Sequence, residues 1–243
     1  MRAPRLFTDQ PLATGMEITL EPGASRHIVT VLRFTPGSSI TLFNGEGGEY
    51  AATLHGGSGK QASVSVGRFS DMDRQSPLAI HLGIALSKGD RFDWVVQKAT
   101  ELGVAQITPL ITARTEVRLS AERQQKKCQH WRQVAISACE QSGRNRLPCM
   151  IPPAPCRDWL SVQADVKLVL HPATANSPLL PRDLSPTSVA LLVGPEGGFT
   201  DDEVSAALGL GFTPLRLGPR ILRTETAPLA GISIVQAFWG DML

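Results

Sequence analysis

The pattern of hydrophobic and polar positions divides the chain into a strand-rich first part and a longer part in which strands and helices alternate. Turns such as Pro36-Gly37 and Asn44-Gly45 separate the short apolar runs of the first part, and the predicted strands span residues 18–20, 28–32, 39–43, 50–54 and 62–66. Regularly spaced short strands predict a small β-barrel. Residues 25–32 are also compatible with a short helix, which would contain Arg26 and His27.

After the polar, unperiodic stretch 70–77, apolar runs typical of buried strands alternate with helical periodicity. The predicted strands span 78–86, 105–111, 166–170, 189–193 and 214–217. The predicted helices run from Asp90 to Gly103, from Ser120 to about Gly143, from the capping-box residue Thr200 onward, and over 226–239. This alternation predicts an α/β domain with a mainly parallel sheet. We expect one domain over residues 1–72 and a second over 73–243.

Two glycine-containing loops follow neighbouring predicted strands. Residues 194–198 (Gly-Pro-Glu-Gly-Gly) come after strand 189–193, and residues 218–227 come after strand 214–217. Ligands of α/β sheets bind at the carboxyl ends of the strands, and glycine lets a ligand approach the backbone closely. The loops therefore form a candidate cofactor site, although a single Gly-Gly is also compatible with an ordinary strand-to-helix turn.

The residues around the first loop disfavour a phosphate ligand. The chain has no G-x-G-x-x-G and no glycine-rich loop ending in Gly-Lys-Ser/Thr. Glu196 lies in the loop, and Asp201 and Asp202 lie in the first turn of the next helix, where their charge would repel a phosphate. A ligand of positive or mixed charge fits these residues better.

Three segments together resemble the signature of the RsmE family, the ribosomal RNA small subunit methyltransferases E. They are residues 192–199 (LVGPEGGF), 217–218 (LG) and 221–227 (ILRTETA). His27, residues 31–33 and residues 42–45 are similar to the family's PUA-like RNA-binding barrel. Two positions depart from it, since many relatives have a second histidine where Arg26 stands and an acid where Ser38 stands.

The resemblance implies an S-adenosylmethionine-dependent enzyme that methylates N3 of a uridine in 16S ribosomal RNA. It also implies a SPOUT fold with a C-terminal trefoil knot, and a homodimer with its active sites at the subunit interface. The implied cofactor-binding residues are Leu170, His171, Pro172, Gly194, Pro195, Glu196, Gly197, Leu217, Gly218, Ile221, Leu222, Thr226 and Ala227. A structural role for His171 is the alternative.

The expected chemistry requires that N3 of uridine lose its proton and that the resulting anion be held in line with the methyl group. An arginine could stabilise this anion. Arg223 is the first candidate and Arg220 the second, while Glu225 is a candidate base or a residue that orients Arg223.

Basic residues gather in several parts of a chain whose formal net charge is only +2. Clustered lysines and arginines are typical of surfaces that bind RNA phosphates, although many such clusters are simply solvated. The candidate RNA-binding residues are Arg26, His27, Arg33, Lys88, Arg91, Arg114, Arg123, Lys126, Lys127 and Arg144. Residues 140–144 (EQSGR) also match a family motif near the active site.

The composition indicates the class of protein, its compartment and the state of its cysteines. The chain has 243 residues, of which 42% are hydrophobic and 19% charged, as in ordinary globular proteins. No apolar run is long enough to span a membrane and the first residues lack a signal-peptide core, so we expect a cytoplasmic protein. The four cysteines contain no C-x-x-C pair, which favours reduced thiols and no metal site.

The sequence is also compatible with two other functions. A related SPOUT enzyme could methylate another RNA nucleotide, which only substrate mapping would distinguish. A non-catalytic RNA-binding protein could use the barrel and the basic helix alone, and absence of cofactor binding would favour that hypothesis.

Overall fold

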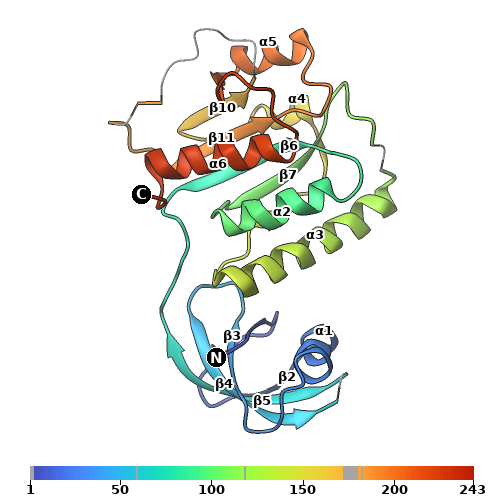
Figure 1. The fold of residues 1–243 in the computed structure, drawn as a ribbon, viewed down its shortest axis with the longest axis vertical. Coiled ribbons are helices and arrows are strands. Elements are labelled where there is room, and N and C mark those ends of the chain that lie inside the picture. The colour runs from blue at the N-terminus through green and yellow to red at the C-terminus, as the bar shows by residue number, and fades with distance from the viewer. Residues whose placement is uncertain (1–2, 59, 118, 172–179, 182) are drawn as a thin grey trace. The chain divides into compact units, whose positions relative to one another are not determined.

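A computed structural model of the chain describes residues 3–58, 60–117, 119–171, 180–181 and 183–243. The fold consists of two units. Figure 1 shows the chain coloured by residue number, from blue at the N-terminus to red at the C-terminus. Unit 1 contains residues 1–75 together with 139–147, and unit 2 contains residues 76–138 together with 148–243. A short segment from the middle of the sequence therefore belongs to the first unit.

Unit 1 is built on a five-stranded sheet with the order β1-β3-β4-β5-β2. Its strands are β1 (Arg5–Phe7), β2 (Glu17–Thr19), β3 (Ser39–Phe43), β4 (Glu49–Gly57) and β5 (Ala62–Ser70). Side chains alternate along the strands, so that Ile40, Leu42, Val64 and Val66 are buried in one core. Four of the five predicted strands are confirmed, and β1 was not predicted because three residues are too few to show a pattern.

The remaining predicted strand, 28–32, is wrong. This segment is helical, with α1 (Pro22–Arg26) continuing into a π-helical turn, η1 (His27–Val31). Ile28 is fully buried whereas Val31 is 61% exposed. The alternative prediction, a short helix containing Arg26 and His27, is correct.

Residues 139–147 join unit 1 through polar contacts with β1. The Arg5 guanidinium donates hydrogen bonds to the carbonyl oxygen of Arg144 and to the side chain of Asn145, and it pairs with Glu49. The backbone N–H of Phe7 donates to Oε1 of Glu140 at 3.0 Å. Because these groups are shielded from water, their mutual hydrogen bonds are needed to offset the cost of burial.

The position of Arg144 corrects one prediction from the sequence. Its side chain is buried, with 3% exposed, and its Nη2 donates to Oε1 of Gln75 at 2.6 Å. The prediction that Arg144 forms part of an exposed basic surface is therefore wrong.

Unit 2 is a parallel sheet with the strand order β12-β10-β11-β6-β7-β8, in which β9 also pairs with β7. The strands are β6 (Ala79–Ala85), β7 (Gln106–Ile111), β8 (Cys149–Met150), β9 (Ala154–Pro155), β10 (Val166–Leu170), β11 (Ser188–Val193) and β12 (Thr213–Leu215). Each of these pairings is parallel, which confirms the sheet predicted from the sequence.

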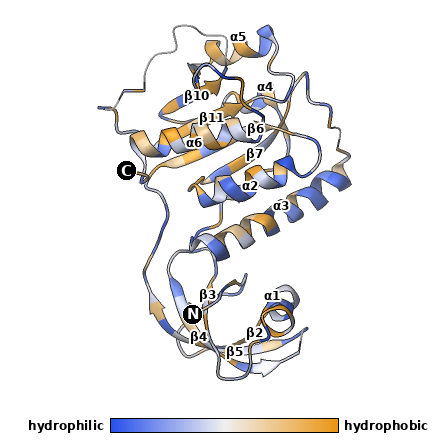
Figure 2. Cartoon of the chain, in the orientation of Figure 1, coloured by the Kyte–Doolittle hydropathy of each residue, from blue (hydrophilic) through white to orange (hydrophobic). Residues whose placement is uncertain are grey.

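Helices cover both faces of this sheet, as is typical of α/β folds. They are α2 (Arg91–Glu101), α3 (Ala121–Ser142), α4 (Cys156–Trp159), α5 (Asp201–Gly209) and α6 (Thr226–Trp239). Alternate side chains of β11 point to the two faces of the sheet. Leu191 and Val193 pack in one core with α2, α3 and α6. Ala190 and Leu192 pack in a second core with α4 and α5. Figure 2 shows the hydrophobic strands between the helices.

Two findings concern all the described residues of the chain. None of the helices in the described parts of the chain combines the length and apolar character needed to cross a membrane. Among the described residues, no group of three or more histidine, cysteine, aspartate or glutamate side chains is arranged to hold a metal ion.

His81 in β6 is a partly buried titratable group of the sheet. Trp159 donates its indole N–H to Nε2 of His81 at 3.0 Å, and Thr108 Oγ1 lies 2.8 Å from the same nitrogen. An indole N–H can only donate, so Nε2 must be unprotonated and the imidazole neutral. Burial lowers the pKa of His81 to about 4.

We predict that this histidine makes the fold less stable in mild acid. In the unfolded chain its pKa is near 6.5, so between pH 6.5 and 4 the unfolded state binds more protons. Its contribution to stability is full above pH 6.5 and decreases as the pH falls toward 4. From pH 7 to 5, the free energy of unfolding should fall by roughly 1–2 kcal/mol more in the wild type than in His81→Gln, measured by urea denaturation. Equal losses would contradict this role.

Candidate cofactor site

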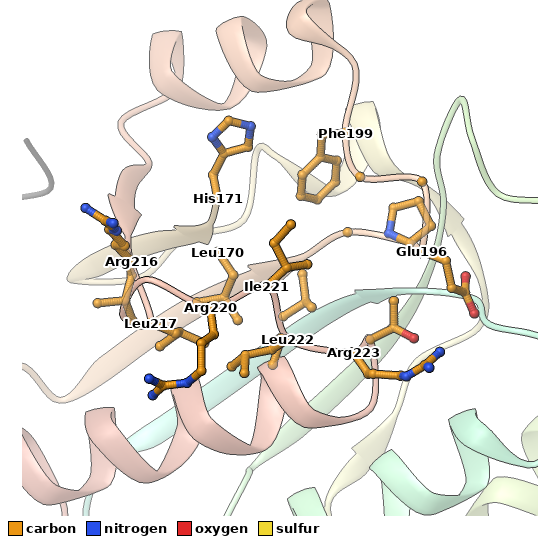
Figure 3. Close-up of a pocket in the computed structure, with 18 of the residues that line it drawn as sticks. Leu170, His171, Glu196, Phe199, Arg216, Leu217, Arg220, Ile221, Leu222 and Arg223 are labelled. Carbon is orange, nitrogen blue, oxygen red and sulfur yellow. The ribbon is translucent and has the colours of Figure 1, made fainter. Parts of the chain in front are cut away.

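Three neighbouring parallel strands end at the same edge of the unit 2 sheet. They are β12, β10 and β11, whose carboxyl ends continue into residues 216–218, 171 and 194–198. A cavity of about 710 Å³ lies at this edge, and Figure 3 shows its lining. The lining residues are Arg91, Arg114, Leu170, His171, Val193, Gly194, Pro195, Glu196, Gly197, Gly198, Phe199, Leu215, Arg216, Leu217, Gly218, Arg220, Ile221, Leu222, Arg223, Thr224 and Ala227.

Glycines at this edge keep the backbone accessible from the cavity. A Cβ placed on Gly194 would lie 3.0 Å from Cε2 of Phe199, which is too close for an ordinary contact. Gly218 has a φ of 84°, a conformation that residues with a side chain rarely adopt. The two loops therefore present backbone groups and the leucine side chains of Leu217 and Leu222 to a ligand.

Contacts with residues far away in sequence hold the first loop in place. Thr200 and Glu203 form the predicted capping box of α5, with hydrogen bonds of 2.9 and 3.2 Å. The other oxygen of the Glu203 carboxylate accepts from the backbone N–H of Ala113 at 2.8 Å. Arg114 donates to the carbonyl oxygens of Gly197 and Phe199 at 2.6 and 3.3 Å. The turn at 112–115 thus braces the loop that follows β11.

The charged side chains of the lining fall into paired and unpaired groups. Arg91 Nη1 donates to Oε1 of Glu196 at 2.9 Å, with both side chains about half exposed. Within the described residues, the exposed guanidinium groups of Arg220 and Arg223 have no hydrogen-bond or ion-pair partner. Figure 3 shows Arg223 extending toward the side of the cavity where Glu196 lies, and Arg220 extending toward the opposite side.

Comparisons with known proteins identify the family. Residues 74–236 match the family described as RNA methyltransferase domain, and residues 20–67 match the RNA methyltransferase PUA domain. Ribosomal RNA small subunit methyltransferase E of Buchnera aphidicola (subsp. Schizaphis graminum) is 33% identical over 99% of this chain and 98% of that protein. The chain belongs to the RsmE family. The Bacillus subtilis RsmE is also 33% identical, over 94% of this chain and 93% of its own length.

Solved structures support the assignment of this chain to the RsmE family. A Legionella pneumophila protein, solved in complex with bound S-adenosylmethionine (SAM), has a TM-score of 0.96 and 42% identity over the full length of both chains. The RsmE of Neisseria gonorrhoeae, bound to SAM, has a TM-score of 0.90 and 38% identity over both full lengths. The fold is therefore that of a SPOUT methyltransferase with an N-terminal PUA-like domain; the trefoil knot stays a prediction.

Most of the RsmE signature residues predicted to bind the cofactor lie together at the cavity. Leu170, His171, Gly194, Pro195, Glu196, Gly197, Leu217, Gly218, Ile221, Leu222 and Ala227 all line it. Thr226 does not line it, and Pro172 is outside the described residues. Ile221 is 90% exposed, so its side chain is available to a ligand or a second molecule.

Only two of the three candidate catalytic residues of this RsmE chain line the cavity. Arg220 and Arg223 line the cavity, whereas Glu225 does not. The Glu225 carboxylate accepts a hydrogen bond from Oγ1 of Thr224 at 3.2 Å, and the residue immediately precedes α6. No ion pair joins Glu225 to Arg223 among the described residues, so the expected orienting contact is not observed.

Several lining residues were not predicted. Val193, Phe199 and Leu215 are apolar positions next to the loops, and their periodicity alone does not distinguish a cavity wall from core. Arg91 and Arg114 were predicted to contact RNA, and both line this cavity beside the predicted cofactor-binding residues, so RNA contact by them stays a prediction. Their positions depend on long-range contacts with residues 196–199, for which the sequence contains no local signal.

The other candidate RNA-binding residues lie in both units. Arg26, His27 and Arg33 are exposed on the helical segment of unit 1 and just after it. On α3, Lys126 pairs with Glu122 at 2.7 Å, Lys127 lies 5.9 Å above the Trp131 ring, and Arg123 is exposed. These contacts are typical of a solvated helix face and leave RNA binding there a prediction.

Proposed function

We propose that this chain methylates N3 of a uridine in 16S ribosomal RNA, with SAM as the methyl donor. The observation that carries this proposal is the cavity at the ends of β10, β11 and β12, lined by nearly all the RsmE signature residues. Family membership, and two structural neighbours solved with SAM, support the cofactor.

The lining residues fit this methyl donor. Leu170, Leu217 and Leu222 provide apolar contacts for an adenosine group, and the open backbone at Gly194 and Gly218 provides hydrogen-bonding groups. Glu196 is the one acidic side chain among the described lining residues, so it is the candidate partner for a positive charge on the ligand. SAM would supply an activated methyl group at this site.

The protein's own contribution to the chemistry concerns the acceptor base. N3 of uridine carries a proton and becomes nucleophilic only after losing it, which places negative charge on the uracil imide. A guanidinium that meets this charge stabilises the transition state more than the ground state. Arg223 is positioned for this role because its side chain lines the cavity and has no partner among the described residues.

The proposed reaction can be tested with small-subunit particles from a strain that lacks the enzyme. Purified protein and SAM should methylate these particles, and mass spectrometry of the nucleosides should identify 3-methyluridine. A different methylated nucleoside would indicate a SPOUT enzyme with another target. Tight particle binding without cofactor binding would indicate a non-catalytic RNA-binding protein.

Domain roles follow from the same proposal. We assign residues 1–72 to a PUA-like RNA-binding domain and residues 73–243 to the methyltransferase domain, acting on ribosomal RNA in the cytoplasm. The exposed Arg26, His27 and Arg33 are the candidate phosphate contacts of the first domain.

A homodimer is supported by the composition of α6. The helix has no charged residue over its 14 positions, and Figure 2 shows it mainly in hydrophobic colours. Ile232 and Val235 are buried in the core, but Ala230, Ile234 and Ala237 form a second apolar stripe that is only half-buried. Helices that are apolar on all sides are normally covered on all sides. We propose that a second copy of the chain covers this stripe.

We predict that Ile234→Glu converts the dimer to a monomer at micromolar concentration, because it places a charge in an apolar interface. Analytical ultracentrifugation should show the mass halved. Leu208→Glu is the matched control, since Leu208 is an exposed leucine on α5. An unchanged dimer in the Ile234→Glu protein, or a monomeric wild type, would count against this interface.

A further inference from the structure

A second cavity, of about 510 Å³, adjoins the cofactor cavity in unit 2. The two share Arg91, Arg114, Glu196 and Gly197. The residues that line only the second cavity are Leu86, Lys88, Ala113, Thr115, Glu116 and Val117. A molecule in the second cavity would therefore lie next to the one in the cofactor cavity.

Two cationic side chains of this cavity, Lys88 and Arg91, form ion pairs with exposed glutamates that another anion could replace. Lys88 pairs with Glu116, and their side chains are 67% and 70% exposed. Arg91 pairs with Glu196, and the Lys88 pairing lowers the pKa of Glu116. Exposed ion pairs contribute little to stability because water and salt screen them, so another anion can replace a carboxylate. Arg114 differs, since its guanidinium is bound to backbone carbonyl oxygens.

The backbone at this cavity also favours an anion. Helix α2 begins at Arg91, a lining residue, and the side chain of its N-cap residue, Asp90, makes no capping hydrogen bond. The N-cap side chain therefore leaves the first N–H groups of the helix available, and the helix dipole places partial positive charge at the same end. Two acids, Asp90 and Asp93, lie at this helix end as well, and the Asp93 carboxylate is bound to His130 and Trp131. Lysine, arginine and an uncapped helix end together are the elements of a phosphate site.

We propose that the second cavity binds a phosphate group of the acceptor RNA beside the target nucleotide. Lys88 and Arg91 bind the phosphate, and Glu116 and Glu196 are internal counter-ions that it replaces. This proposal rests on the proposed function, because it is the neighbouring cofactor cavity that makes RNA the expected occupant. The other source of an anion is the carboxylate of the cofactor's amino-acid end, and the measurements below separate the two.

The two residues of the Lys88–Glu116 pair allow a test by opposite effects, since neither lines the cofactor cavity. Binding of small-subunit particles from a strain lacking the enzyme is measured over a range of salt concentrations, and SAM affinity is measured by calorimetry. Lys88→Ala should weaken particle binding by about 3- to 10-fold and reduce the salt slope by about 1, as for one lost phosphate contact. Glu116→Gln should strengthen binding by about 2- to 5-fold, because it removes a competing anion.

A matched control is Lys98→Ala. Lys98 also pairs with a glutamate, Glu101, on the same helix, but lines neither cavity. This variant should bind particles like the wild type, and all three variants should keep their SAM affinity within about 2-fold.

Three outcomes would overturn the proposal. If Lys88→Ala weakens SAM binding and leaves particle binding unchanged, the cavity holds the cofactor's carboxylate. If Lys88→Ala and Glu116→Gln weaken particle binding equally, the ion pair only maintains the loop. If neither changes particle binding, no phosphate binds there. Failure of the proposed function is a separate result, because it would be seen as a wild type that binds particles without methylating uridine N3.

Discussion

Arg223→Ala is expected to lower the single-turnover rate of methyl transfer by about 100-fold or more, which is the scale of losing one preorganised donor. The same change should leave SAM affinity within a few-fold. Arg223 lines the cavity and has no partner among the described residues, so its removal disrupts no contact seen in the fold. Its contribution should therefore appear mainly where negative charge develops on the uracil.

Two related variants sharpen the test of Arg223. Arg223→Lys keeps the charge but loses the planar fork of the guanidinium, so it should restore only part of the rate. Arg220→Ala should cause the smaller loss, because Arg220 extends toward the other side of the cavity. Dimer mass, SAM affinity and single-turnover rate should be measured on the same preparations. Near-normal transfer by Arg223→Ala would remove this residue from the mechanism, and a loss of dimer or SAM binding would indicate a structural role.

Gly194→Val is expected to abolish detectable SAM binding. Gly194 lines the cavity directly after β11, and even a Cβ there would lie 3.0 Å from the Phe199 ring. The larger valine must project into the ligand space or push Phe199 from its position, and either change narrows the cavity. Isothermal titration calorimetry on the folded variant measures the effect.

A glycine in open space provides the control for this substitution. Gly209 lies at the end of α5, and a Cβ added to it would meet no atom within 4 Å, so Gly209→Val should bind SAM normally. Circular dichroism and thermal unfolding show whether each variant is folded. Unchanged SAM affinity in a folded Gly194→Val protein would mean that the cofactor binds elsewhere.

Local patterns were sufficient to predict the elements that build the candidate cofactor site. The predicted boundaries of strand 166–170 and helix 226–239 agree with β10 and α6, and the capping box at Thr200 is formed. These features depend on side-chain periodicity and on contacts within three or four residues. Because parallel strands carry their following loops to one edge of the sheet, the sequence also predicted that loops 194–198 and 218–227 meet. The two strands before these loops are not adjacent as predicted, because β10 lies between β11 and β12.

The tertiary structure decided every feature that depends on residues distant in the chain. Residues 139–147 join unit 1, and Arg144 is buried there, because Arg5 and Gln75 provide partners more than 60 positions away. Arg91 and Arg114 belong to the cavities because Glu196 and the carbonyl oxygens of residues 197 and 199 lie within hydrogen-bond distance. A sequence pattern records the polarity and spacing of neighbours, whereas these pairings arise only when the folded chain brings distant groups together and burial makes each require a partner.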